Sequence, residues 1–150
     1  MKIAIASDHG GVELKKELVD YLSNNHEVLD LSMENTSTDD YPDFAYVVGK
    51  SIQNKETDLG ILICASGSGM CITANKINSV YCVKANTVEE AKLSREHNGA
   101  NTIALSGSID STLAKEMIEA FINAQPLNDE RHQRRYDKII KIESAEYNGL

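Results

Sequence analysis

The chain has 150 residues, 41% of them hydrophobic, and its 23 acidic and 15 basic side chains give a formal net charge of -8. This length is typical of one domain, so we expect a single domain over residues 1–150. An acidic surface repels nucleic acid and anionic membranes, and no apolar stretch approaches the roughly 20 residues of a membrane span. We therefore expect a cytoplasmic protein that binds neither nucleic acid nor a membrane.

The three cysteines, Cys64, Cys71 and Cys82, are odd in number and lack a paired C-x-x-C spacing. This pattern supports neither a disulfide framework nor a zinc site. We expect Cys71 and Cys82 to be small core residues, which is the usual fate of a free cysteine.

Short apolar runs alternate along the chain with segments whose apolar residues recur at helical spacing. The runs predict strands at residues 2–6, 26–31, 59–64, 80–84 and 102–105. The helical segments begin near residues 14, 42, 69, 88 and 111, and a charged amphipathic helix lies around residues 136–142. Thr87 and Glu90 form a capping box, and Ser111 is expected to cap the helix that it begins.

Strands that alternate with helices predict parallel pairing through right-handed crossovers. The predicted fold class is α/β, a three-layer Rossmann-like sandwich with a five-stranded parallel sheet and a C-terminal helix. Ligands of such sheets sit outside the carboxyl ends of the strands. This rule brings Asp8 and His9, which follow the first strand, to the same edge as the loop after the third strand.

That loop reads CASGSG, from Cys64 to Gly69. Its small residues let backbone N–H groups approach a ligand, and the helix start that follows favours an anion. The loop lacks the lysine of a P-loop and the spacing of a dinucleotide fingerprint. A thiol beside a helix start favours the thiolate, so Cys64 could act as a base or a nucleophile. The alternatives are a tight turn that needs small residues and a buried strand cysteine.

Other candidates each have a structural alternative. Asp8 and His9 could bind hydroxyls and an anion, or they could cap the first helix. Tyr41 could hydrogen-bond a ligand or only pack at a helix entrance. His97 and Asn98 end a helix, where the dipole favours a histidine whatever its function.

Two arginines are also candidates, because they are clustered in an acidic chain. Arg131 and Arg135 are four residues apart on one helical face, so together they could grip a phosphate. A solvated charge run is the alternative.

Six segments occur in order along the chain: KIAIASDHGG, DYPDF, GILICASGSGM, ANK, SREHNGAN and RHQRR. Together they resemble the type B ribose-5-phosphate isomerase family, which also contains the galactose-6-phosphate isomerase subunits. The resemblance implies an aldose–ketose isomerase that uses no metal or cofactor and acts on a phosphorylated sugar through an enediolate. It also implies a homodimer, which could pair further, with active sites built from both subunits.

The resemblance implies a role for each matching residue. Cys64 falls on the base that shuttles a proton between two carbons, and His97 falls on the residue that opens the sugar ring. Ser66 stands beside the base, and Asp8 matches a contact to hydroxyl groups of the ligand. The remaining substrate contacts that the resemblance implies are His9, Tyr41, Ala65, Gly67, Ser68, Gly69, Asn98, Arg131 and Arg135.

Three positions depart from the family's usual pattern. Ala65 stands where glycine is usual, and Tyr81 and Ser108 stand where arginines are common. These residues leave open two alternatives to ribose 5-phosphate isomerisation, namely an isomerase of a six-carbon sugar phosphate and a non-catalytic sugar-phosphate-binding protein. A third alternative, a thiol hydrolase, rests on Cys64 as nucleophile and His97 as base.

Overall fold

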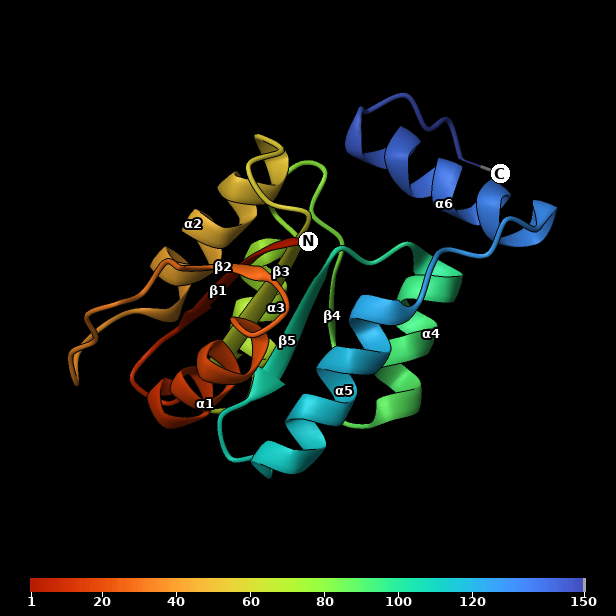
Figure 1. Ribbon diagram of the computed structural model, residues 1–150. Helices are drawn as coiled ribbons and strands as arrows, with labels where there is room; N and C mark the ends of the chain where they lie inside the picture. Colours follow the sequence, from red (N-terminus) through yellow and green to blue (C-terminus); the bar gives the residue numbers. More distant parts are fainter. Residues whose placement is uncertain (150) are drawn as a thin grey trace.

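The computed structural model describes residues 1–149 of the chain and contains a five-stranded sheet (Figure 1). The strands are β1 (Lys2–Ser7), β2 (Glu27–Asp30), β3 (Leu59–Cys64), β4 (Cys82–Lys84) and β5 (Thr102–Ser106). Their order is β2-β1-β3-β5-β4, and every pair is parallel. The predicted parallel α/β sheet is confirmed.

Helices cover both faces of the sheet, as Figure 1 shows. They are α1 (Val12–Leu22), α2 (Tyr41–Gln53), α3 (Ser68–Ala74), α4 (Val88–Asn98), α5 (Ser111–Asn123) and α6 (Glu130–Glu143). Helices α1, α4 and α5 enclose one apolar cluster, and α2 and α3 enclose another. Helix α6 extends beyond the three layers and contacts α4.

Strand β3 is buried along its whole length because it lies in the middle of the sheet. Successive side chains of a strand point to opposite faces. Ile61 and Ile63 accordingly face the α1, α4 and α5 layer, whereas Leu62 and Cys64 face α2 and α3. The alternation therefore places the Cys64 sulfur on the same face of the sheet as α3.

One local prediction is wrong. Asp110, not Ser111, caps α5, because the Asp110 carboxylate accepts hydrogen bonds from the Thr112 and Leu113 amides at 3.0 and 3.2 Å. No helix among the described residues has the length and apolar character needed to cross a membrane.

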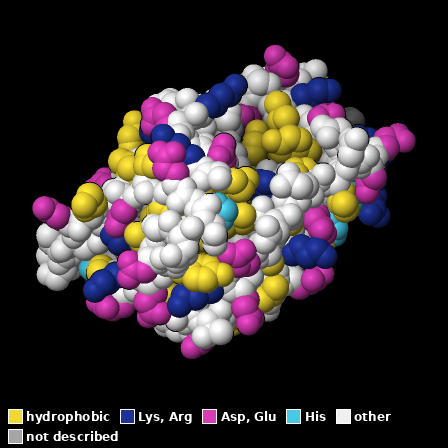
Figure 2. Space-filling model, in the orientation of Figure 1, with side chains coloured by type: hydrophobic (Ala, Val, Ile, Leu, Met, Phe, Trp, Pro, Cys, Tyr) yellow, Lys and Arg dark blue, Asp and Glu magenta, His cyan; other side chains and the backbone are white. Residues whose placement is uncertain are grey.

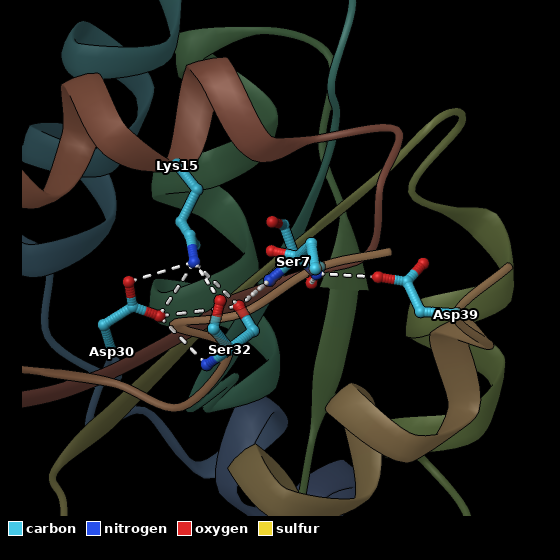
Figure 3. Close-up of polar contacts among 6 residues, drawn as sticks. Ser7, Lys15, Asp30, Ser32 and Asp39 are labelled. Atoms are coloured by element: carbon cyan, nitrogen blue, oxygen red, sulfur yellow. Dashed lines mark hydrogen bonds and ion pairs between the residues drawn. The ribbon is translucent and has the colours of Figure 1, made fainter. Parts of the chain in front are cut away.

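A buried lysine fastens the segment after β2 to the end of β1. The Lys15 ammonium lies 3.0 Å from each carboxylate oxygen of Asp30, donates to the Ser32 hydroxyl at 3.1 Å, and also donates to the Ser32 carbonyl (Figure 3). The same hydroxyl accepts a hydrogen bond from the Ser7 amide at 2.8 Å. An ammonium group taken out of water needs such a set of partners, so the segment can take few other positions.

Lys15→Met is expected to lower the free energy of unfolding by about 3 kcal/mol, because it leaves the Asp30 carboxylate without its ammonium partner. Urea denaturation measures the change. Lys16→Met, on the exposed neighbour, is the matched control and should change little. Equal urea midpoints for the two variants would contradict the role of the ion pair.

Candidate functional site

The carboxyl edge of the sheet brings together most of the residues predicted for the site. We call Asp8, His9, Tyr41, Cys64 and Ser66, with the amides of residues 65–69, the carboxyl-edge group. Cys64 is the last residue of β3, and its side chain is almost fully buried. The Gly67 amide donates a hydrogen bond to the Cys64 sulfur at 3.1 Å. This hydrogen bond holds the sulfur against the loop that follows β3.

Gly67 lets the loop turn back over the end of β3. Its φ of 77° lies in the left-handed region, and a side chain there would meet the Leu105 carbonyl at 2.9 Å. A residue with a Cβ would be strained there, and the Gly67 amide would move away from the sulfur. The Tyr41 ring, from the first residue of α2, packs against Gly69 on the other side of the loop.

Asp39, a residue that no sequence motif singled out, holds His9 in place. Asp39 accepts hydrogen bonds from the His9 amide at 3.0 Å and from its Nδ1 at 2.6 Å. This side-chain hydrogen bond is the main cause that raises the pKa of His9. Desolvation would raise the pKa of the Asp39 carboxyl, but hydrogen bonds from three residues, His9 among them, lower it to about 2. The His9 imidazole is exposed, and its protonated form suits an anion.

Asp39 is itself fixed to the sheet through Asn35. The Asn35 side-chain amide donates to the Ser7 carbonyl and to Asp39 Oδ2, both at 2.8 Å. Ser7 is also the residue that the Lys15 network holds, as Figure 3 shows. The orientation of His9 thus depends on a chain of contacts that begins at Lys15. Asp8 accepts a hydrogen bond from the Gly10 amide at 2.8 Å, which keeps its carboxylate at the turn.

A polar hollow of about 390 Å³ adjoins the loop. It is lined by Ala65, Ser66, Lys84, Asn86, Ser106, Ser108 and Ile109. Lys84 ends β4 and forms no ion pair among the described residues. Sequence reasoning did not single out this lysine, although the carboxyl end of a parallel strand belongs at this edge. The Ser108 hydroxyl bonds the Ser106 hydroxyl at 2.8 Å in the same hollow.

The remaining predicted residues gather elsewhere. We call His97, Asn98, Arg131 and Arg135 the amino-edge group. His97 and Asn98 end α4, and the two arginines are exposed on α6. Residues 102–106 form β5, and residue 64 pairs with residue 106 at its far end. The length of β5, roughly 13 Å, therefore separates the two groups within one chain.

His132, the second residue of RHQRR, stacks on His97. Their ring centroids are 4.4 Å apart with 12° between the planes, and the His132 side chain is buried. The Arg131 guanidinium donates to His132 Nε2 at 3.2 Å. Sequence reasoning included His132 only as one of a run of charges. The stack fixes the plane of the His97 ring, so His132 is a positioning residue for His97.

Tyr81 holds α6 in place. Its ring packs edge-on against Tyr136 at 5.2 Å, and its hydroxyl donates to Glu143 at 3.3 Å. The Ser79 amide donates to the same carboxylate at 2.7 Å. Desolvation of the hydroxyl is the main cause that raises the pKa of Tyr81. Tyr81 therefore supports the helix that carries the two arginines.

Residues 1–149 contain no group of three His, Cys, Asp or Glu side chains that could hold a metal ion. The chain has a parallel α/β sheet with a thiol, an acid and a glycine-bearing loop at its carboxyl edge. These features place it in the class of Rossmann-like proteins, which bind small ligands at that edge. The cationic groups at both edges suit a ligand that carries an anion.

The comparisons with known proteins specify the family. The model of the Ribose/Galactose Isomerase family matches residues 3–139. Ribose-5-phosphate isomerase B of Escherichia coli (strain K12) is 38% identical over 144 residues, which cover 95% of this chain and 96% of that protein. The chain belongs to this family of sugar-phosphate isomerases.

Solved structures agree in fold. Ribose-5-phosphate isomerase B of Clostridium thermocellum superposes with a TM-score of 0.92 at 37% identity, over 98% of this chain and 100% of that one. The Mycoplasma genitalium enzyme, with ribulose 5-phosphate bound, gives a TM-score of 0.88 at 39% identity, over 95% and 96%.

Asp39→Asn is expected to lower the pKa of His9 toward 6.5, because the main cause of its rise is the hydrogen bond to Asp39. NMR titration of the imidazole measures the shift. Because the folded-state pKa of His9 is raised, its hydrogen bond to Asp39 stabilises the fold fully below pH 6.5. This stabilisation is lost as pH rises through the raised pKa. The pair's contribution through Asp39 is lost as pH falls below 3.8 toward 2. Asp43→Asn, at an exposed residue of α2, is the control and should leave the pKa of His9 unchanged. An unchanged His9 pKa in Asp39→Asn would contradict the assignment.

Proposed function

We propose that the chain interconverts ribose 5-phosphate and ribulose 5-phosphate through an enediolate, with Cys64 as the proton-shuttling base and His97 opening the sugar ring. The observation that carries the proposal is the position of the Cys64 sulfur. It lies at the carboxyl end of the central strand, 3.1 Å from the Gly67 amide and at the head of a loop of backbone donors. A relative 39% identical to this chain holds ribulose 5-phosphate in its solved structure.

The reaction needs a base, a set of N–H donors and a cation, and the two edges of the sheet offer candidates for each. A base must stand beside a carbon acid, and N–H donors must face the enediolate oxygens where negative charge develops. Cys64 and the amides of residues 65–69 fit these two roles. A fixed cation must hold the phosphate so that the reacting carbons stay in register with the base. His9 and Lys84 at one edge, and Arg131 and Arg135 at the other, are suited to this third role.

We further propose that the working site combines the carboxyl-edge group of one subunit with the amino-edge group of a second copy. The roughly 13 Å between the groups within one chain exceeds the reach of a single ring-opening and proton-transfer site. A closed two-fold pair of identical chains would form two such sites, because each chain supplies one group to each site.

The surface of α6 supports this pairing. Ile139, Ile140 and Ile142 are 41%, 40% and 60% exposed, and Figure 2 shows hydrophobic side chains gathered over this helix. Ile72 on α3 and Tyr46 on α2 are also exposed, at 64% and 55%. Apolar side chains concentrated on helices of an otherwise acidic chain are typical of a homodimer interface.

Cys64→Ser is expected to lower kcat by at least 1,000-fold, on the order of a lost general base, while substrate still binds. Formation of ribulose 5-phosphate measures turnover, and calorimetry with ribose 5-phosphate measures binding. Wild-type protein that binds the sugar without converting it would support the non-catalytic alternative. Near-normal turnover in the variant would contradict the role of Cys64.

Mixing two inactive variants tests the shared site. Equal amounts of Cys64→Ser and His97→Asn, unfolded and refolded together, are expected to recover about a quarter of wild-type activity. Half of the dimers would be mixed, and each would hold one site with both native residues. The variants refolded separately are the controls. If both residues acted within one chain, the mixture would be no more active than the controls.

A further inference from the structure

Two thiols outside the two edge groups lie side by side, one on α3 and one on β4. The Cys71 sulfur lies 3.4 Å from the Cys82 carbonyl oxygen, which brings the two cysteines together where α3 contacts β4. Cys82 is buried in the apolar cluster between the sheet and the α2 and α3 layer, and Cys71 packs against that cluster. The expectation of a core residue is therefore confirmed for Cys82, whereas Cys71 is only half-buried, and their proximity across two elements was not predicted.

Asn75 holds the two cysteines in register. Its Oδ1 accepts a hydrogen bond from the Cys82 amide at 2.9 Å, and its Nδ2 donates to the Cys82 carbonyl at 2.7 Å. The same Nδ2 lies 3.6 Å from the Cys71 sulfur. One side-chain amide thus binds the backbone of β4 in the way that a neighbouring strand would. The contact keeps the end of α3, and with it Cys71, against Cys82.

The two thiols have different environments. The hydrogen bond with Cys82 is the main cause that lowers the pKa of Cys71 to about 7, and the Lys84 amide, Asn75 and the Lys84 charge lower it further. The same shared hydrogen bond, together with burial, raises the pKa of Cys82. Cys71 is half-buried and Cys82 is buried. Cys71 is therefore the thiol that a reagent can reach, and its lowered pKa suits it to attack, whereas Cys82 is enclosed.

We propose that Cys71 and Cys82 form a peroxide-reactive dithiol that closes a reversible disulfide between α3 and β4. The Cys71 thiolate attacks one oxygen of hydrogen peroxide, the O–O bond breaks, and the released hydroxide takes up a proton. The sulfur of Cys82 then attacks the sulfenic sulfur of Cys71 and loses its proton, and the hydroxyl group leaves with a proton as water. Two thiols are oxidised, one peroxide is reduced, and two waters form. This chemistry does not depend on the proposed isomerisation.

Peptide mapping tests the disulfide. Trypsin places Cys71 on residues 56–76 and Cys82 on residues 77–84. After one equivalent of hydrogen peroxide at pH 7 and blocking of free thiols, the two peptides are expected to be joined, and dithiothreitol should separate them. Because residues 56–76 also contain Cys64, the experiment is repeated in Cys64→Ser, and fragmentation of the wild-type linked peptide identifies the partner independently. The proposal would be overturned if the two peptides stayed separate after peroxide, if Cys64 formed the disulfide, or if disulfides formed only between two chains.

Matched variants test the order of the two steps. In Cys82→Ser, peroxide is expected to leave a sulfenic acid at Cys71 that dimedone labels, whereas Cys71→Ser should give no label at Cys82. In the reduced wild type, the rate of Cys71 alkylation by iodoacetamide should rise about tenfold between pH 6 and pH 8. Dimedone labelling of Cys82 instead, or Cys71 alkylation no faster at pH 7 than that of an ordinary free thiol, would overturn the assignment of Cys71 as the attacking sulfur.

Discussion

The parallel direction of the five strands is the constraint on which the arrangement of the site depends. Because each strand ends at the same edge, the residues that follow β1 and β3 meet there, and the thiol of Cys64 comes beside Asp8 and His9. The same constraint returns every crossover helix to the opposite edge. His97, at the end of α4, therefore cannot lie beside Cys64 of its own chain. A reaction that uses both residues needs two chains, so the topology connects the proposed chemistry to assembly.

Helix α6 is the second part of this arrangement. It lies outside the sandwich, where the sheet cannot hold it, and a few contacts to the α3–β4 connection and to α4 determine its place. Tyr81 packs against Tyr136 and bonds Glu143, and His132 stacks on His97. A tyrosine at residue 81 thus removes a cation from this position but gives the arginine-bearing helix a firm attachment. Tyr81 therefore accounts both for the missing arginine and for the attachment of α6.

The sequence was sufficient for the strands and for the carboxyl-edge group, because both follow from local patterns. The apolar run at residues 59–64 matches β3 at both ends, and the position of CASGSG follows from it. Individual side-chain contacts between distant segments were not predictable. Asp39 beside His9 and the Cys71–Cys82 pair each join two elements, and no spacing along the chain encodes such a neighbour. The Asp110 cap was missed for a different reason, since Asp and Ser are equally good caps and only geometry separates adjacent candidates.

Ala65 shows how a departure from a usual pattern can be accommodated by a neighbouring residue. Its methyl group adjoins Gly10 of the turn after β1, where a Cβ would lie 3.2 Å from the Ala65 Cβ and 2.8 Å from its amide nitrogen. The loop can approach the turn this closely because residue 10 has no side chain. Alanine also has less backbone freedom than glycine, so the loop loses less entropy when it orders its amides toward a ligand. With Gly10 in place, a methyl group at residue 65 is compatible with a closely packed loop, and it restricts the motion of the donors that follow Cys64.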